Sequence, residues 1–253
     1  MAAQAAAANL HIISLTDHDT AAGVRELQTA ELPLTLIPGI EISSTHDGRD
    51  VHMLGYFIDA AHPSILAHEE RARDGRNIRM RKMIAKLDAL GVHVSFEEVK
   101  AAAGDGDVLG RPHLARVLVD HGYVPSHAQA FDRYIGDGGP AFSPTELVTP
   151  GDAIRIIHEA GGVAVWAHPP TQTVERDIGP FVQLGLDGVE CIRPRSQPID
   201  VQTMEGYAGL HGLLVTGGSD WHGPWSGKLG DFCVGRREVG RFLERGHIGR
   251  PYF

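Results

Sequence analysis

The amino-acid sequence predicts an α/β fold of the β/α-barrel type with a helical insertion. Short apolar runs of strand length recur along the chain, and each is followed by a polar cluster and then by a stretch with helical periodicity. This alternation is typical of a parallel sheet that is buried on both faces. A chain of 253 residues is also long enough for one such barrel with an insertion.

We expect each apolar run to form one strand of the sheet. The runs comprise residues 10–15, 34–37, 51–58, 163–167, 188–192 and 213–216. In folds of this type the functional residues gather beyond the carboxyl ends of the strands. The residues that directly follow these runs are therefore the first candidates for a functional site.

The alternation of strand-like and helical segments stops in the middle of the chain, where the patterns are mainly helical. The predicted helices are residues 68–90, 96–103 and 112–121, and they end at Gly91, Gly104 and Gly122. We therefore expect two parts. Residues 1–62 and 151–253 form the barrel, and residues 63–150 form a helical insertion that caps the barrel mouth.

Composition limits the classes of function. A net charge of −9 argues against a broad surface for duplex DNA, although a single nucleotide can bind in a local basic pocket. No apolar run approaches the roughly 20 residues that a helix needs to cross a bilayer. The first residues have no basic side chain ahead of the alanines, unlike a secretory signal, and Cys191 and Cys233 form no disulfide framework. We therefore expect a cytoplasmic protein without membrane attachment.

Histidines and carboxylates stand at or near the ends of the predicted strands. The chain contains 15 histidines, and histidine is the commonest metal ligand. The residues in these positions are Asp17, His18, Glu41, His52, His168, Asp220 and His222. A single such residue is more often a helix cap, a turn residue or a core histidine than a metal ligand. Together they predict a multinuclear metal site, because parallel strands bring these positions to one face and these side chains suit zinc, manganese or iron.

Six motifs occur in a characteristic order along the chain. They are Leu15-Thr16-Asp17-His18-Asp19-Thr20, Gly39-Ile40-Glu41-Ile42-Ser43, His52-Met53-Leu54-Gly55-Tyr56, Gly110-Arg111-Pro112-His113, Ala167-His168-Pro169 and Gly218-Ser219-Asp220-Trp221-His222. In this order the motifs resemble those of the polymerase and histidinol phosphatase (PHP) family, especially its nucleotide phosphatase and exoribonuclease branch. The resemblance covers nearly the whole chain, including the helical insertion.

The resemblance implies a distorted (β/α)7 barrel that holds up to three divalent metal ions, such as Mn²⁺, Zn²⁺ or Fe²⁺. Glu41 is then expected to bridge two metal ions. His52 and His168 are expected to complete the site of one of those ions. His18 and His222 are expected to bind a second ion, and Asp220 the remaining ion. Asp17 is expected to lie just outside the ligand set.

The sequence departs from the family pattern at its start. Members of the family open with a strand that carries His-x-His, followed shortly by an aspartate, and no such motif occurs before Thr16. The alanine-rich residues 2–9 are predicted to be the end of the helix that follows this first strand in members of the family. We therefore expect the first strand to be missing from this sequence, so that one metal ion loses two imidazoles and a second loses a carboxylate.

The expected reaction is hydrolysis of a phosphate ester. Clustered metal ions supply a nucleophilic hydroxide and neutralise the phosphoryl oxygens, with Glu41 and Asp220 as the carboxylates that hold them. Guanidinium groups add bidentate contacts to phosphate, and the candidates are Arg111, Arg193 and Arg195. His113 is expected to contact a phosphate or to assist the leaving group.

The resemblance implies a small phosphorylated substrate. A nucleoside 3′,5′-bisphosphate, a nucleoside monophosphate and the 5′ end of a short RNA all remain open. Two other interpretations also remain open. An amidohydrolase-type barrel gathers similar residues but often uses a modified lysine to bridge its metal ions, and no lysine here directly ends a predicted strand. A phosphate- or nucleotide-binding relative with impaired catalysis is favoured by the missing His-x-His.

Overall fold

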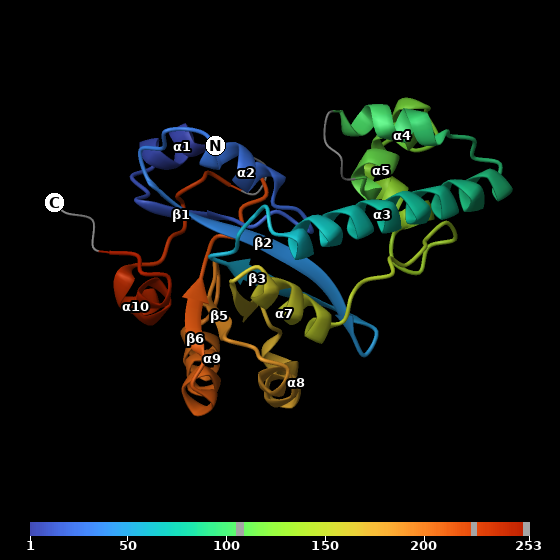
Figure 1. Cartoon of the computed structure of the whole chain (residues 1–253). Coiled ribbons are helices and arrows are strands. Elements are labelled where there is room, and N and C mark those ends of the chain that lie inside the picture. Colours follow the sequence, from blue (N-terminus) through green and yellow to red (C-terminus); the bar gives the residue numbers. More distant parts are fainter. Residues whose placement is uncertain (105–108, 224–226, 250–253) are drawn as a thin grey trace. The chain divides into compact units, whose positions relative to one another are not determined.

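The structure is a computed structural model of the chain, and it describes residues 1–104, 109–223 and 227–249. The chain divides into two compact units (Figure 1). Residues Met1–His68 and Val148–Phe253 form the first, which we call the sheet unit. Residues Glu69–Leu147 form the second, which we call the helical unit.

The sheet unit is built on one six-stranded sheet whose strands are ordered β1 to β6 in space as in sequence. The strands are β1 (Ile12–Leu15), β2 (Thr35–His46), β3 (Arg49–Tyr56), β4 (Val163–Trp166), β5 (Gly188–Ile192) and β6 (Leu214–Gly217). The sheet is curled like part of a barrel (Figure 1). The prediction of a barrel-like α/β fold is therefore confirmed at this level.

The expectation of an entirely parallel sheet is wrong at β3. This strand runs antiparallel to both of its neighbours, whereas β1 pairs with β2, β4 with β5, and β5 with β6 in parallel. The reason is the tight turn at Asp47 and Gly48, which both have positive φ angles, of 49° and 72°. An Asp-Gly pair between two strands is a strong hairpin signal, and a two-residue turn joins only antiparallel strands.

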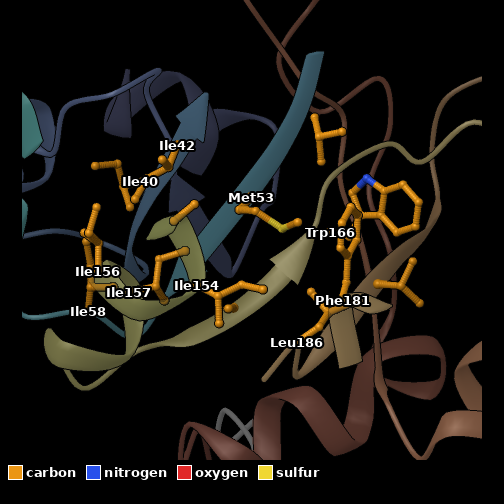
Figure 2. Packing of buried hydrophobic residues seen from close by; sticks show 14 of the residues in the cluster. Ile40, Ile42, Met53, Ile58, Ile154, Ile156, Ile157, Trp166, Phe181 and Leu186 are labelled. Atoms are coloured by element: carbon orange, nitrogen blue, oxygen red, sulfur yellow. The ribbon is translucent and has the colours of Figure 1, made fainter. Parts of the chain in front are cut away.

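Side chains alternate between the two faces of the sheet, and the apolar face forms the main core. Ile40, Ile42, Met53 and Trp166 lie on this face and pack with Phe181, where the rings of Trp166 and Phe181 meet edge-on at 4.9 Å (Figure 2). The helices α7 (Pro150–Glu159), α8 (Thr171–Gln183) and α9 (Pro198–His211) contribute to this core. Because the period along a strand is two, Glu41 between Ile40 and Ile42 points to the opposite face.

The opposite face carries polar residues and a smaller apolar cluster. That cluster joins Leu54 and Tyr56 to Phe242 of helix α10 (Arg236–Arg245), and the rings of Tyr56 and Phe242 lie 4.9 Å apart. Direct cross-strand partners share a face, and the register pairs Glu41 with Leu54 and Glu190 with Thr216. The short helices α1 (Ala2–Ala7) and α2 (Ala22–Gln28) flank β1 in sequence.

The helical unit has its own core. It takes up most of α3 (Pro63–Ala89), followed by α4 (Phe96–Ala103), α5 (Arg111–Asp120), α6 (His127–Ala130) and a π-helical turn (Phe131–Ile135). Met83, Leu87 and Leu114 are among its fully buried side chains. A capping box between Ser95 and Glu98 starts α4 where the sequence predicts. That this unit caps the barrel mouth stays a prediction.

No helix in the described ranges is long and apolar enough to cross a membrane.

Candidate metal centre

The candidate site is centred on Glu41 in the middle of β2. This residue is only 4% exposed. Burying a carboxylate is costly unless charged or polar partners replace the water that it loses. The partners here are imidazoles that arrive from both sides of β2.

Glu41 contacts three histidines through two different oxygens. Its Oε1 lies 2.7 Å from Nδ1 of His52 and 3.2 Å from Nε2 of His168, and these two ring nitrogens are 3.1 Å apart. Its Oε2 lies 3.9 Å from Nδ1 of His18. One atom from each of His18, Glu41 and His52 falls within 4.8 Å of the others, a spacing at which a metal ion can bind.

Backbone pairing beyond the strand ends explains why these residues meet. After β1, the Asp19 N–H donates to the Glu41 carbonyl at 2.8 Å and the Glu41 N–H donates to the Asp17 carbonyl at 3.1 Å, which places His18 beside Glu41. After β4, the Ala167 N–H donates to the His52 carbonyl at 3.0 Å. The next residue, His168, is thereby held beside His52.

The loop after β6 brings two more predicted ligands to the cluster. Nε2 of His222 lies 3.4 Å from Nε2 of His18. Nδ1 of His222 lies 2.8 Å from the Asp220 carbonyl oxygen and 3.5 Å from its Oδ1. The structure therefore joins all six predicted metal ligands in one connected group of side chains. Asp17 contributes its carbonyl to Glu41, and its side chain is exposed.

Two of these residues adopt an unusual backbone conformation. His168 has a φ of 32° and Asp220 a φ of 48°, in the left-handed region that residues other than glycine rarely occupy. Such conformations persist only when surrounding contacts hold them, and they are concentrated at functional sites. His168 lies two residues after the end of β4, and Asp220 lies three residues after the end of β6.

The histidines keep Glu41 ionised. Burial alone raises its pKa, but hydrogen bonds from His168 and His52 and the nearby charge of His18 lower the pKa to about 2. Burial tends to lower the pKa of His168. The hydrogen bond between His168 and Glu41 and the charges of the surrounding carboxylates oppose burial, and overall the pKa of His168 is raised. The pKa of His18 is lowered, mainly by burial, so that its imidazole is neutral at pH 7.

These residues fit a divalent metal ion. Nδ1 of His18 is buried, faces Oε2 of Glu41, and has no hydrogen-bond partner in the part of the chain that the structure describes. A buried ring nitrogen without a partner is costly in a folded protein, and metal coordination satisfies it. Imidazole and carboxylate together suit Zn²⁺, Mn²⁺ or Fe²⁺.

Two buried carboxylates beside the site were not predicted from the sequence. Glu190 on β5 is 5% exposed and accepts the His168 N–H at 2.9 Å. Burial raises its pKa to about 7, although that N–H and the charges of His168 and Arg193 oppose the shift. Asp19 is also buried; its Oδ1 accepts the Ser43 N–H at 2.8 Å and lies 3.1 Å from Nε2 of His68. Glu190 interrupts an apolar strand, and that signal was available in the sequence.

The predicted phosphate-binding residues have different surroundings. Arg193 is half-buried beside Glu190, and its Nε has no hydrogen-bond partner among the described residues. Arg195 is exposed and has a φ of 64°. In the helical unit, Nη1 of Arg111 donates to Oδ1 of Asp137 at 2.6 Å, and Nδ1 of His113 accepts the Gly110 N–H at 3.1 Å. Roles for these four residues stay predictions.

Comparison with known proteins establishes the ancestry of the chain. No model of a known protein family matches it. It is 36% identical over 228 residues to the 5′-3′ exoribonuclease of Haemophilus influenzae, a match that covers 87% of this chain and 82% of that protein. It is 32% identical over 255 aligned residues to the 3′,5′-nucleoside bisphosphate phosphatase of Chromobacterium violaceum, covering 98% and 87%.

A solved structure agrees with these relatives. The crystal structure of a proposed metal-dependent phosphoesterase from Bifidobacterium adolescentis matches the fold with a TM-score of 0.82 at 31% identity, covering 97% of this chain and 89% of that one. Identity of this level over most of both chains is too extensive for a shared fold alone. The chain therefore belongs to the polymerase and histidinol phosphatase family of phosphoesterases, in its branch of nucleotide phosphatases and exoribonucleases.

Proposed function

We propose that this chain is a metal-dependent phosphoesterase that hydrolyses a phosphate ester of a small nucleotide substrate. The observation that carries the proposal is the position of Glu41, a buried carboxylate whose two oxygens face different imidazoles. Two relatives with the names of a nucleoside bisphosphate phosphatase and a 5′-3′ exoribonuclease support the substrate class. The substrate is a nucleoside 3′,5′-bisphosphate, a nucleoside monophosphate or the 5′ end of a short RNA.

The donor set divides between the two oxygens of Glu41. His52 and His168 face Oε1, and His18 faces Oε2, which fits a carboxylate that bridges two metal ions. His222 extends the second group through its contact with His18, and Asp220 lies against His222. When bound, divalent ions lower the pKa of a coordinated water and neutralise charge on the phosphoryl oxygens.

The protonation states of the candidate ligands differ, and they determine what metal loading requires of each residue. Glu41 is anionic at neutral pH because its pKa is held near 2. The raised pKa of His168 means that this imidazole gives up a proton when it becomes a ligand, so metal binding is expected to release protons. His18 is neutral beforehand and needs no such step.

Arg193 is the best candidate for binding the phosphate. Its side chain is half-buried, its Nε lacks a hydrogen-bond partner in the described ranges, and a guanidinium group can bind phosphate oxygens. Arg195, on the same loop, is the weaker candidate because it is exposed. Arg111 already donates to Asp137, so a phosphate must compete with that carboxylate.

His113 is better suited to donating a hydrogen bond than to acting as an acid. Burial, and then the nearby charge of Arg116, lower its pKa, so the imidazole is neutral at pH 7. Its Nδ1 accepts the Gly110 N–H, which leaves the ring proton on Nε2. A neutral imidazole of this tautomer can donate to a phosphate oxygen through Nε2.

At the level of architecture, we propose that the strands β1 to β6 correspond to the second to seventh strands of the distorted family barrel. The helical unit is then the insertion that caps the barrel mouth. Arg111 and His113 are assigned to the substrate because of their motif, Gly110-Arg111-Pro112-His113.

The first test measures metal per chain and hydrolysis together. Protein purified without chelator and supplied with Mn²⁺ or Zn²⁺ is analysed by elemental mass spectrometry. Release of inorganic phosphate is then measured from adenosine 3′,5′-bisphosphate, and release of a nucleoside 5′-monophosphate is measured from a 5′-phosphorylated RNA dinucleotide. Metal binding with hydrolysis of either compound supports the proposal. Metal and nucleotide binding without hydrolysis would instead identify a phosphate-binding relative with impaired catalysis.

A further inference from the structure

Glu190 is an ionisable residue on the sheet face that carries Glu41. Its strand β5 lies between β4 and β6, the two strands that lead into His168 and Asp220. Its neighbours Val189 and Cys191 point into the apolar core on the other face. A carboxylate that is 5% exposed at such a position requires a compensating function or partner.

One oxygen of Glu190 holds the backbone of a predicted metal ligand. The pairing of β4 with β5 ends at Trp166 and Val189, so the residues beyond Trp166 lack a partner in that ladder. Oε2 of Glu190 accepts the His168 N–H at 2.9 Å in place of a backbone carbonyl. This bond is made at the residue whose φ is 32°, a conformation that needs support from its surroundings.

The other oxygen faces the second ligand loop. A Cβ placed on Gly218 would lie 3.6 Å from Oε1 of Glu190. The Gly218 N–H donates to the Ile192 carbonyl at 3.1 Å, so this loop is attached to the same strand. The Glu190 carboxylate therefore lies between the segments that carry His168 and Asp220.

We propose that Glu190 is a positioning residue of the metal centre. It holds the His168 backbone so that Nε2 of His168 faces Glu41 and His52, and it thereby sets the metal affinity without being a ligand. The inference rests on the proposed function in one respect, namely that His168 binds metal. Groups that orient a ligand from behind typically change metal affinity by about 10- to 100-fold when they are removed.

The test compares metal affinity in Glu190 variants by competition with a chromophoric chelator, using Zn²⁺ or Mn²⁺ alone. Glu190→Leu removes the acceptor and should weaken metal affinity by roughly 10- to 100-fold. Glu190→Gln keeps an oxygen that can accept the His168 N–H, so its affinity should stay close to that of the wild type. Co²⁺ loading gives a second readout, since a shifted visible spectrum in Glu190→Leu but not in Glu190→Gln reports altered ligand geometry.

Two further variants complete the design. Glu190→Asp keeps the carboxylate but shortens the side chain by one methylene, and this variant should weaken metal binding. It keeps the proposal testable if Glu190→Leu does not fold. Glu175→Leu, at an exposed position on α8, is the matched control and should bind metal like the wild type. Circular dichroism of metal-free protein checks that each variant is folded.

The outcomes separate the two proposals. Wild-type affinity in Glu190→Leu or Glu190→Asp overturns the positioning role. An equal loss in Glu190→Gln and Glu190→Leu also overturns it, because the charge and not the accepted N–H would then matter. A wild-type chain that binds metal but hydrolyses nothing overturns only the proposed function, whereas one that binds no metal overturns both.

Discussion

The Glu41 carboxylate on β2 lies 2.7 Å from Nδ1 of His52 on β3, although the two residues are not opposite each other in the ladder. The antiparallel register pairs Glu41 with Leu54 and His52 with Ser43. Diagonal neighbours on one face of a sheet are within reach of long side chains. The hairpin therefore builds the centre of the site, and the segments after β1, β4 and β6 add to it.

Replacing Glu41 by Gln should abolish the metal centre. The substitution keeps the size of the side chain but removes the negative charge that both groups of imidazoles face. We expect metal affinity to fall by at least about 100-fold, beyond the effect of losing an outer contact, and hydrolysis to fall below detection. Elemental mass spectrometry and phosphate release measure these effects. Exposed Glu26 supplies the control Glu26→Gln, and unchanged metal content in Glu41→Gln would reject the site.

Substitution of Arg193 should separate phosphate binding from metal binding. Loss of a charge-assisted hydrogen bond of roughly 1.5–3 kcal/mol corresponds to about a 10- to 100-fold weaker affinity for inorganic phosphate in Arg193→Ala. Metal content should not change, because Nε of Arg193 makes no hydrogen bond to a predicted ligand side chain in the described residues. Isothermal titration of the metal-loaded protein measures the affinity. Arg195→Ala on the same loop is the comparison, and an equal effect of both variants would argue for general electrostatics.

Glu190 should make the metal-free protein less stable as pH rises. Its pKa is raised from 4.5 to about 7, so the folded state keeps a proton that the unfolded state has already lost between these values. The free energy of unfolding therefore falls through this window, by on the order of 3 kcal/mol for a shift of this size. Glu190→Gln removes this contribution. Urea unfolding with chelator present measures the free energy of unfolding of both proteins. Between pH 4.5 and pH 7 this free energy should rise in Glu190→Gln relative to the wild type. Parallel pH profiles of the two proteins would contradict the prediction.

His68→Leu should destabilise the segment that carries His18. The imidazole of His68 contacts Asp19, whose carboxylate also accepts the Ser43 N–H. Removal of one partner from a buried carboxylate costs about 1–3 kcal/mol. Urea unfolding of the metal-free protein measures the loss, and metal affinity should fall as well if Asp19 holds His18 in place. A variant as stable as the wild type would show that Asp19 needs only the backbone donor.

Much of the secondary structure follows from local patterns. The predicted run 188–192 coincides with β5, and the predicted helix 96–103 coincides with α4. The predicted strand 34–37 is too short, because β2 continues through Pro38 and Gly39 to His46. A Pro-Gly pair usually ends a strand, but here the chain continues through it, since Pro38 still pairs with Leu15 and Gly39 with Tyr56.

The amino-acid sequence by itself determined which residue types stand in or just after the apolar runs, and hence that imidazoles and carboxylates are available for metal ions. This information is local, because apolar runs and the polar residues after them can be read within a few positions. Only the tertiary structure decided that β3 is antiparallel, that one Glu41 oxygen faces His52 and His168 while the other faces His18, and that Glu190 supports His168. These relationships join residues that are far apart in the chain, and they depend on strand register and burial, which no short stretch of sequence specifies.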